Sequence, residues 1–370
     1  MANELVCLRI SRIPRRRLVA SFKLLRLCLA ALLAASFCVS AAHAQKWSRL
    51  APFPEPSEEL WGASAGGKLY VFGGLAPGWK PKGYVYEYDL GNDSWTKKTS
   101  MPLASHHVAA AELNGKIYMF GGFKYPDAAK PDGQPNPGWQ PVDNAWEYDP
   151  ANDTWKALAP MPTKRGSSNA VVHGGKIYVI GGASMHPGSK ETFIHPARPH
   201  RSVDTNEVYD PATNTWETRS PMPTARNHAA AGMANNKIYI IAGRIGAGFI
   251  TRGSSVNVVE EYDPATDQWG ALKAPMPTAR SAVAFGTNRG KIYVAGGEDQ
   301  NSRQLSAFRA VEAFDPVTNT WTILPSMQYP RHGLAGAFVG NRFHLVSGDA
   351  QSASSGLETH VPYHDVLELL

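Results

Sequence analysis

Short apolar and polar segments alternate along this chain in a pattern that recurs every 48 to 61 residues. In each repeat an alternating apolar segment ends in two small residues, and a Trp follows an acidic turn further on. The small pairs are Gly73-Gly74, Gly121-Gly122, Gly181-Gly182, Ala242-Gly243, Gly296-Gly297 and Ser347-Gly348. The Trp residues are Trp47, Trp95, Trp155, Trp216, Trp269 and Trp321. Self-similarity at such a period is typical of one supersecondary unit copied several times, so it predicts a repeat architecture.

Each repeat contains four short strand signals. The first is a run of small residues, which begins near His107, Ser168, His228, Ala282 and Gly333. The second is the alternating apolar segment, the third ends in an acidic aromatic step such as Tyr148-Asp149, and the fourth starts at the Trp. Short strands at even spacing, with turn residues between them and no helical period, predict an all-β array.

Four features recur in register: the glycine pair, the Tyr/Phe-Asp-Pro turn, the Trp and a Met-Pro step after it. In this combination the chain resembles the kelch-repeat β-propellers over essentially all of residues 46–370. The resemblance implies a ring of four-stranded blades whose inner strands meet at one axis, where only small residues fit. Residues 364–369 match the third strand of a unit, and residues 46–50 supply a matching fourth strand. We therefore predict a six-bladed propeller over residues 45–370 whose last blade is closed by the N-terminal strand.

The first 44 residues carry a pattern typical of a secretory signal peptide. Seven basic residues precede or flank an apolar stretch at 27–39, and Ala42-His43-Ala44 is a small-x-small cleavage motif. The apolar stretch is shorter than the roughly 20 residues that a spanning helix needs, and a retained membrane anchor is the alternative. We expect cleavage after Ala44 and a secreted or periplasmic protein.

Removal of residues 1–44 changes what the composition implies. Of the 37 basic and 31 acidic residues, seven and one lie in this segment, so 30 of each remain and the mature chain is formally neutral. The basic balance is therefore no argument for nucleic-acid binding. Cys7, Cys28 and Cys38 also lie there. Their loss excludes a disulfide, a thiol nucleophile and the Cys-Tyr cross-link of the kelch-type copper radical oxidases.

Two sets of loops are expected on one face, around the mouth of the axial channel: those that enter each inner strand and those that follow each small pair. The entry loops are predicted at Trp61-Gly62, at 105–107, 165–167 and 226–228, and at Arg280-Ser281 and Arg331-His332. They supply the candidate ligand-binding residues Arg165, Arg226, Arg280, Arg331, His106, His107, His228 and His332. Four guanidinium groups facing one cavity would favour a carboxylate or phosphate. Alternatively, each Arg belongs to the repeat and pairs with a third-strand acid: Glu147, Glu207, Glu260, Glu312 or Glu368.

Histidines also gather in the loops that follow two of the small pairs. His186, His195 and His200 lie with Glu191 within residues 186–204, and His360 and His364 lie near the C-terminus. Imidazole groups bind zinc or copper, but the irregular spacing favours solvated loops, and we expect neither a metal nor another cofactor. No nucleophile motif, paired-carboxylate spacing or phosphate-binding loop is present in the sequence, so no catalytic residue is assigned.

These observations favour a non-catalytic binding module that acts as a monomer. We expect a protein, peptide or glycan on its loop face, with an anionic small molecule as a further option, and neither nucleic acid nor a membrane span. The alternative comes from the resemblance, because exported kelch proteins include N-acetylneuraminate epimerases and mutarotases. In such a sugar-processing enzyme, Arg226, His228, Arg280, Arg331 and His332 would bind the substrate carboxylate and transfer protons.

Overall fold

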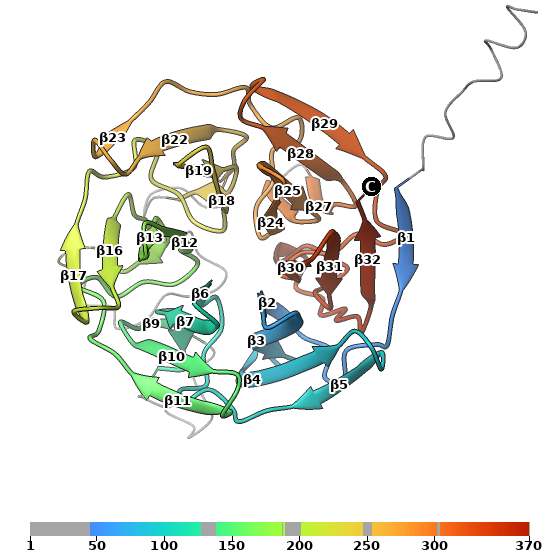
Figure 1. Ribbon diagram of the computed structural model, residues 1–370. Coiled ribbons are helices and arrows are strands. Elements are labelled where there is room, and N and C mark those ends of the chain that lie inside the picture. Colours follow the sequence, from blue (N-terminus) through green and yellow to red (C-terminus); the bar gives the residue numbers. More distant parts are fainter. Residues whose placement is uncertain are drawn as a thin grey trace, which may run out of the picture. The chain divides into compact units, whose positions relative to one another are not determined.

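The computed structural model describes residues 45–126, 138–186, 188, 201–246, 254–301 and 304–369. The chain divides into two units, Met1–Ala44 and Gln45–Leu370, and only the second is described here. This unit consists of six four-stranded antiparallel sheets arranged in a ring around a central axis (Figure 1). Within the described part of the chain, no helix has the length and apolar character needed to cross a membrane. The predicted all-β, six-bladed propeller is confirmed.

Each blade is built from an inner strand, two middle strands and an outer strand. Blade one contains β2 (Glu58–Ala65), β3 (Lys68–Ala76), β4 (Lys80–Asp89) and β5 (Ser94–Lys97), and blade two contains β6 (Ala109–Leu113), β7 (Lys116–Phe120), β10 (Ala145–Asp149) and β11 (Thr154–Ala157). Blade three contains β12 (Asn169–His173), β13 (Lys176–Ile180), β16 (Asn206–Asp210) and β17 (Thr215–Thr218), and blade four contains β18 (Ala230–Ala234), β19 (Lys237–Ile241), β22 (Val259–Asp263) and β23 (Gln268–Trp269). Blade five contains β24 (Ala284–Asn288), β25 (Lys291–Ala295), β28 (Val311–Asp315) and β29 (Thr320–Leu324).

Blade six is assembled from both ends of the unit. It contains β30 (Ala335–Val339), β31 (Arg342–Val346) and β32 (His364–Glu368), and β1 (Lys46–Arg49) is its outer strand. Lys46 lies opposite Glu368 and Arg49 opposite Asp365 in the antiparallel register. Figure 1 shows β1 running alongside β32 at the edge of the ring. The predicted closure is therefore confirmed, and β1 covers an edge that β32 would otherwise leave open.

Short hairpins extend from the loops that follow the small pairs. They are β8 (Phe123–Lys124) with β9 (Gln140–Pro141), β14 (Ala183–Ser184) with β15 (Arg201–Ser202), β20 (Arg244–Ile245) with β21 (Ser254–Ser255), and β26 (Glu298–Asn301) with β27 (Gln304–Ala307). The corresponding loop of blade six contains a single 3-10 turn, Ala353–Ser355. These additions lie on the loop face, so they surround the end of the channel at which the inner strands begin.

The repeated Trp residues join neighbouring blades. In every blade the indole nitrogen Nε1 donates a hydrogen bond to a backbone carbonyl of the preceding blade. The pairs are Trp47–Pro325, Trp95–Ala51, Trp155–Thr99, Trp216–Ala159, Trp269–Ser220 and Trp321–Ala274, at 2.8 to 3.1 Å. Trp47 closes this series by reaching blade five from β1. A Trp with its ring partly buried and its donor paired is a structural anchor.

The small pairs allow close backbone contact between blades. Gly121 has a left-handed φ of 58°, and a Cβ atom there would lie 2.3 Å from the carbonyl oxygen of Arg165. Gly181 repeats the arrangement one blade later, with 2.7 Å to the carbonyl oxygen of Arg226. At these two positions the contact leaves no room for a Cβ atom, whereas the equivalent positions in blades four and six are occupied by Ala242 and Ser347 with φ of 58° and 56°. The pairs therefore position the entry loops that carry the candidate functional residues.

Candidate functional site

Six equivalent residues form a ring where the chain enters each inner strand. They are Glu59, His107, Ser167, His228, Ala282 and Gly333, and all have a left-handed φ between 52° and 59°. Backbone hydrogen bonds of 2.9 to 3.1 Å link the positions from blade to blade, from the His107 carbonyl through to Leu60 beside Glu59. All six residues line a cavity of about 50 Å³ on the axis. The ring thus projects one residue of each blade towards the channel.

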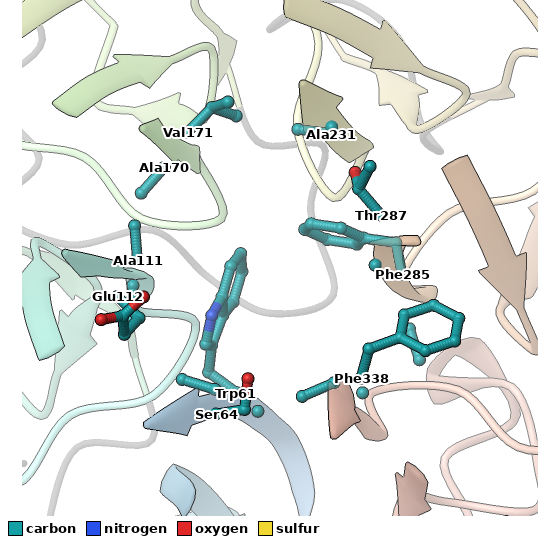
Figure 2. A pocket seen from close by; sticks show the side chains of 18 of the residues that line it. Trp61, Ser64, Ala111, Glu112, Ala170, Val171, Ala231, Phe285, Thr287 and Phe338 are labelled. Atoms are coloured by element: carbon teal, nitrogen blue, oxygen red, sulfur yellow. The ribbon is translucent and has the colours of Figure 1, made fainter. Parts of the chain in front are cut away.

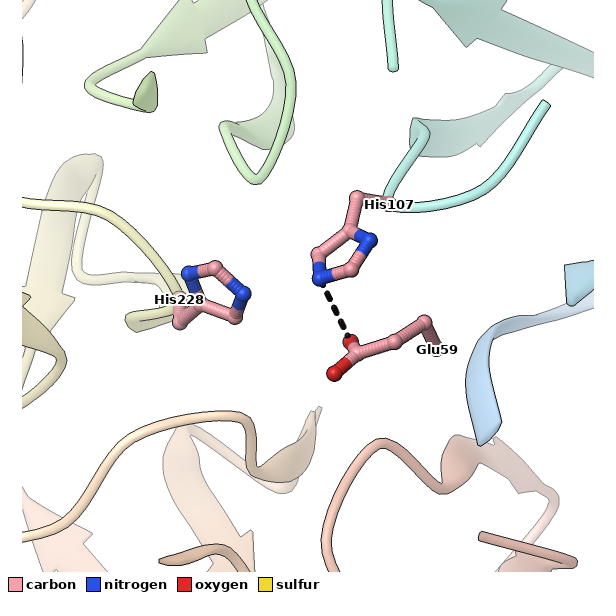
Figure 3. A group of neighbouring side chains, drawn as sticks. All are labelled: Glu59, His107 and His228. Atoms are coloured by element: carbon pink, nitrogen blue, oxygen red, sulfur yellow. Dashed lines mark ion pairs between the residues drawn. The ribbon is translucent and has the colours of Figure 1, made fainter. Parts of the chain in front are cut away.

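Three of these residues bring titratable side chains together. Nε2 of His107 lies 3.1 Å from Oε2 of Glu59, and the imidazole rings of His107 and His228 are 4.7 Å apart at their centres. Figure 3 shows the three side chains facing one another across the axis. Nη2 of Arg244 donates a hydrogen bond to Nε2 of His228 at 2.7 Å. Arg244 in turn pairs with the fully buried Glu298 at 2.8 Å, so a polar network extends from the axis into blade five.

Trp61 and Phe285 separate this polar chamber from a larger cavity. Their rings meet edge to face at 5.3 Å between centres, and both residues line the two cavities. The larger cavity has a volume of about 440 Å³ and lies along the inner strands towards their far ends. Figure 2 shows Trp61, Phe285 and Phe338 around it. Its lining is mostly Ala, Gly and Val, and Glu112 in its wall accepts a hydrogen bond from the amide of Gly115 at 2.7 Å.

A second polar cluster lies beside the axis, where blade six meets blade one. Nε2 of His332 lies 2.9 Å from Oε2 of Glu58. Nε2 of His360 lies 3.7 Å from Oε1 of Glu58 and 3.7 Å from Oδ2 of Asp349. All four side chains are buried. We call Glu58, His332, Asp349 and His360 the rim cluster.

Burial and charge act in opposite directions on the rim cluster. Burial raises the pKa of Glu58, but the adjacent His332 and His360 outweigh it and lower that pKa to about 2. Burial lowers the pKa of His332, but Glu298, Glu58 and Glu59 raise it well above its usual value. Burial raises the pKa of Asp349. An ionised Glu58 therefore lies beside an imidazolium at His332, in a site that excludes most water.

The four candidate arginines lie elsewhere, and the expectation that they face one cavity is wrong. Each is at most 1% exposed and none lines an axial cavity. Arg165 pairs with Glu207, Arg226 with Glu260, Arg280 with Glu312, and Arg331 with Asp365. The physical reason is that a buried guanidinium must be paired, and a third-strand carboxylate of its own blade meets that need. The alternative interpretation is thus correct for three of the acids, and Asp365 takes the place expected for Glu368.

The candidate histidines are distributed over both polar sites. His107 and His228 line the axial cavity, and His332 belongs to the rim cluster. His106 is fully buried behind them, with its ring 5.0 Å from that of Trp139. His364 does not lie in the final loop with His360: it is the first residue of β32, and its Nε2 lies 2.9 Å from Nδ1 of His344. In the loop at 186–204, His195, His200 and Glu191 lie outside the described residues.

Sequence analysis missed the acidic residues Glu58, Glu59, Glu298 and Asp349. The predicted first entry loop at Trp61-Gly62 is out of register, since both residues lie within β2 and the chain enters blade one at Ser57–Glu59. A usable signal exists: the first residue of each small pair lies 14 positions after the axial residue of the same blade, as in His107 and Gly121 or Glu59 and Gly73. The same count identifies all six ring positions.

Comparison with known families agrees with this geometry. The model described as the KLHDC2/KLHL20/DRC7 Kelch-repeats domain matches residues 33–220. The Kelch motif model matches residues 225–270 and 279–328. The chain therefore belongs to the kelch-repeat family, and the propeller described above is a kelch propeller.

Several curated proteins and a solved structure are similar to this chain. Kelch-like protein terF of Aspergillus terreus is 32% identical over 197 residues, which is 53% of this chain and 40% of that protein. Kelch-like protein 25 of Xenopus tropicalis is 29% identical over 205 residues, 55% and 32% of the two chains. Beta-scruin of Limulus polyphemus is 26% identical over 212 residues, 56% and 22%. The chain thus spans less than half the length of these relatives.

The solved structure of YjhT superimposes with a TM-score of 0.67 and covers 87% of this chain and 98% of its own. The two sequences are 19% identical. At that identity the likeness concerns the fold alone.

Proposed function

We propose that this chain is an exported kelch propeller that acts as a binding module and holds a protein or peptide partner on its loop face. The observation that carries the proposal is a pocket of about 650 Å³, lined by Glu55, Pro56, Pro77, Tyr84, Glu358, Thr359 and His360. Glu55 and Pro56 come from the entry segment of blade one, Tyr84 comes from β4, and the others come from the loops that follow two small pairs. The pocket is thus made mainly by the variable loops in which propellers carry function.

The chemistry of the pocket favours a basic partner. Glu55 accepts a hydrogen bond from the Tyr86 hydroxyl at 2.5 Å and is already paired with Lys97 at 2.5 Å. Glu358, which accepts a hydrogen bond from the amide of Gly78 at 2.7 Å, is therefore the carboxylate that a basic partner would contact. None of the seven lining residues is Lys or Arg. Two prolines and Tyr84 supply apolar walls, and Leu357 beside the pocket is 62% exposed. A Lys or Arg side chain next to an apolar residue is complementary to this surface.

The other cavities are less suitable. The 440 Å³ cavity offers few polar side chains to orient a ligand, and the axial chamber of about 50 Å³ is much smaller than typical ligand pockets. The buried arginines are committed to their own blades. An anionic ligand therefore lacks the cationic pocket that the sequence suggested.

A peptide-binding experiment tests this proposal. Peptides selected by display against the mature chain from Gln45 are expected to contain Lys or Arg beside an apolar residue. Glu358→Lys is expected to weaken their binding at least about tenfold. Glu217→Lys on the outer strand β17 is the matched control, because Glu217 is exposed and distant in sequence from the pocket residues. Equal peptide binding by the two variants would show that the pocket is not the peptide-binding site.

Export is tested separately. Expression of the full chain in a bacterial host, followed by N-terminal sequencing of the periplasmic or secreted fraction, is expected to give a product that begins at Gln45. A product that keeps residues 1–44 and sediments with membranes would favour the retained-anchor alternative.

A sugar-processing enzyme is the second candidate, because Glu59, His107 and His228 meet at the axis as groups able to transfer protons. The axial chamber of about 50 Å³ argues against it, because pockets that hold small-molecule ligands are several times larger. Exchange of N-acetylneuraminate anomers, followed by NMR, is expected to proceed at the rate of buffer alone. Acceleration that is abolished in both His107→Gln and His228→Gln would replace the binding proposal with an enzyme.

A further inference from the structure

Glu58, Asp349 and His360 approach one another on the loop face although they come from opposite ends of the chain. Their ligand atoms all lie within 4.8 Å of one another. Asp349 is fixed by two isolated backbone bridges, to His332 on one side and to His360 on the other. The three side chains are therefore held by the closure of the ring between blade six and blade one.

The spacing of these groups is too wide for hydrogen bonds and suitable for a shared ion. The two distances from Nε2 of His360 to the carboxylate oxygens are both 3.7 Å. Neither ring nitrogen of His360 has a hydrogen-bond partner among the described residues, and its side chain is only 4% exposed. A buried imidazole without hydrogen bonds is costly. Two ligands bound at about 2.1 Å to a tetrahedral ion lie about 3.4 Å apart, close to the observed separations.

We propose that Glu58, Asp349 and His360 bind a divalent transition-metal ion, with Zn²⁺ as the best match. One imidazole and two carboxylates are a donor set that suits zinc and also accepts manganese. Two carboxylates balance the charge of a dication, and the imidazolium of His332 lies outside the donor set on the other oxygen of Glu58. Three protein ligands leave one position of a tetrahedral ion open.

The groups around the three ligands hold them in place. Oε2 of Glu58 is engaged by His332 at 2.9 Å, which leaves Oε1 directed at His360. His332 is oriented in turn by the carbonyl oxygen of Gln351, 2.6 Å from its Nδ1. The carboxylate of Asp349 accepts hydrogen bonds from the amides of Gln351 and Thr359 at 2.7 and 2.6 Å. Such outer contacts orient metal ligands in proteins.

The site also has a route to solvent. His360 lines the open 650 Å³ pocket described above, so an ion and its open position are reached from the loop face. His360 belongs to both sites, but the peptide proposal is tested through Glu358 and the metal proposal through His360 and Asp349, so each can fail without the other.

Calorimetric titration with Zn²⁺ tests the site on the mature chain after treatment with a chelator. We expect one tight site per chain, weakened at least about tenfold by His360→Gln and by Asp349→Asn. Circular dichroism and thermal melting check that both variants are folded, and the polar replacements keep side chains of similar size. His173→Gln, on blade three, is the matched control and is expected to bind as the parent does. Bound Zn²⁺ is also expected to raise the melting temperature of the parent and not that of His360→Gln.

Three results would overturn the proposal. One is the absence of saturable Zn²⁺ binding by the parent. A second is binding that survives both His360→Gln and Asp349→Asn but is lost in His107→Gln, which would assign the ion to Glu59, His107 and His228. A third is binding lost only when His186, His195 and His200 are replaced together, which would assign it to that loop. None of these results bears on peptide binding measured without metal, so the two proposals fail independently.

Discussion

The buried pair of Arg226 and Glu260 allows the structural role of the arginines to be measured directly. We consider replacing Arg226 by Met, which has a similar length and no charge. In the parent, Arg226 pairs with Glu260 and also donates to the carbonyl oxygens of Thr224 and Ile240, at 2.9 and 2.8 Å. Arg226 and Glu260 are 1% and 2% exposed. The substitution therefore leaves a carboxylate in the protein interior without its counter-charge.

The expected cost follows from that burial. Removal of one partner of a buried ion pair costs about 3 to 5 kcal/mol, because the remaining charge is uncompensated. Domains are stabilised by about 5 to 15 kcal/mol in total, so the loss is a large fraction of stability. The double variant Arg226→Met/Glu260→Leu removes the stranded charge as well, and we expect it to recover about half of the loss or more.

Urea unfolding followed by fluorescence of the inter-blade Trp residues measures both variants against the parent. Binding of the selected basic peptides is measured in parallel and is expected to be unchanged in the folded double variant. A single variant that loses less than about 1 kcal/mol, or a double variant no more stable than the single one, would refute the reasoning. So would a loss of ligand binding without a loss of stability, which would return Arg226 to the list of ligand-binding residues.

Three further predictions concern the ring. Deletion of residues 45–53 removes β1, the Trp47 hydrogen bond and the buried Phe53, and it is expected to lower the melting temperature of the whole unit; unchanged melting would contradict the closure. Gly121→Ala is expected to lower the free energy of unfolding in urea more than Gly174→Ala does. Both residues have a φ of 58°, but only at Gly121 would the new Cβ atom clash with a backbone atom. Equal losses of stability would show that this clash is unimportant. Burial lowers the pKa of His344 to about 4, whereas the unfolded chain takes up this proton near pH 6.5, so His344 removes stability as the pH falls through that window. His344→Gln is expected to reduce the loss by up to about 1.4 kcal/mol per pH unit, and an unchanged slope in unfolding experiments from pH 6.5 to 4 would exclude this cause.

The four arginines show that a residue type repeated at one position does not by itself distinguish a binding role from a structural role. An Arg recurs in four of the entry loops, and recurrence alone suits either a shared ligand or a shared structural contact. The acids of the third strand were recognised as partners, but the sequence did not decide between the two. Burial decides it, since a charge that is fully removed from water is held by an opposite charge in the same blade.

The sequence alone predicts the architecture: the all-β class, the six blades, the strand that closes blade six and the small residues along the axis. These features repeat in every blade and depend on contacts within a blade or with its neighbour, so their residue types recur at fixed spacing. Trp155 and Gly121 are recognisable for that reason, because each makes the contact that its equivalents make.

Only the tertiary structure decided which polar residues meet. Glu58 lies at the start of the unit and Asp349 and His360 near its end, and ring closure alone brings them to within 4.8 Å. Glu59, His107 and His228 come from three different blades and converge because the left-handed entry residues all face one axis. The ring positions of Glu59, His107 and His228 recur at a fixed spacing, but the residue type there changes from blade to blade, so the repeat does not show which side chains act together. The role of each residue depends on neighbours that are distant in sequence, and on how completely the closed ring excludes water from them.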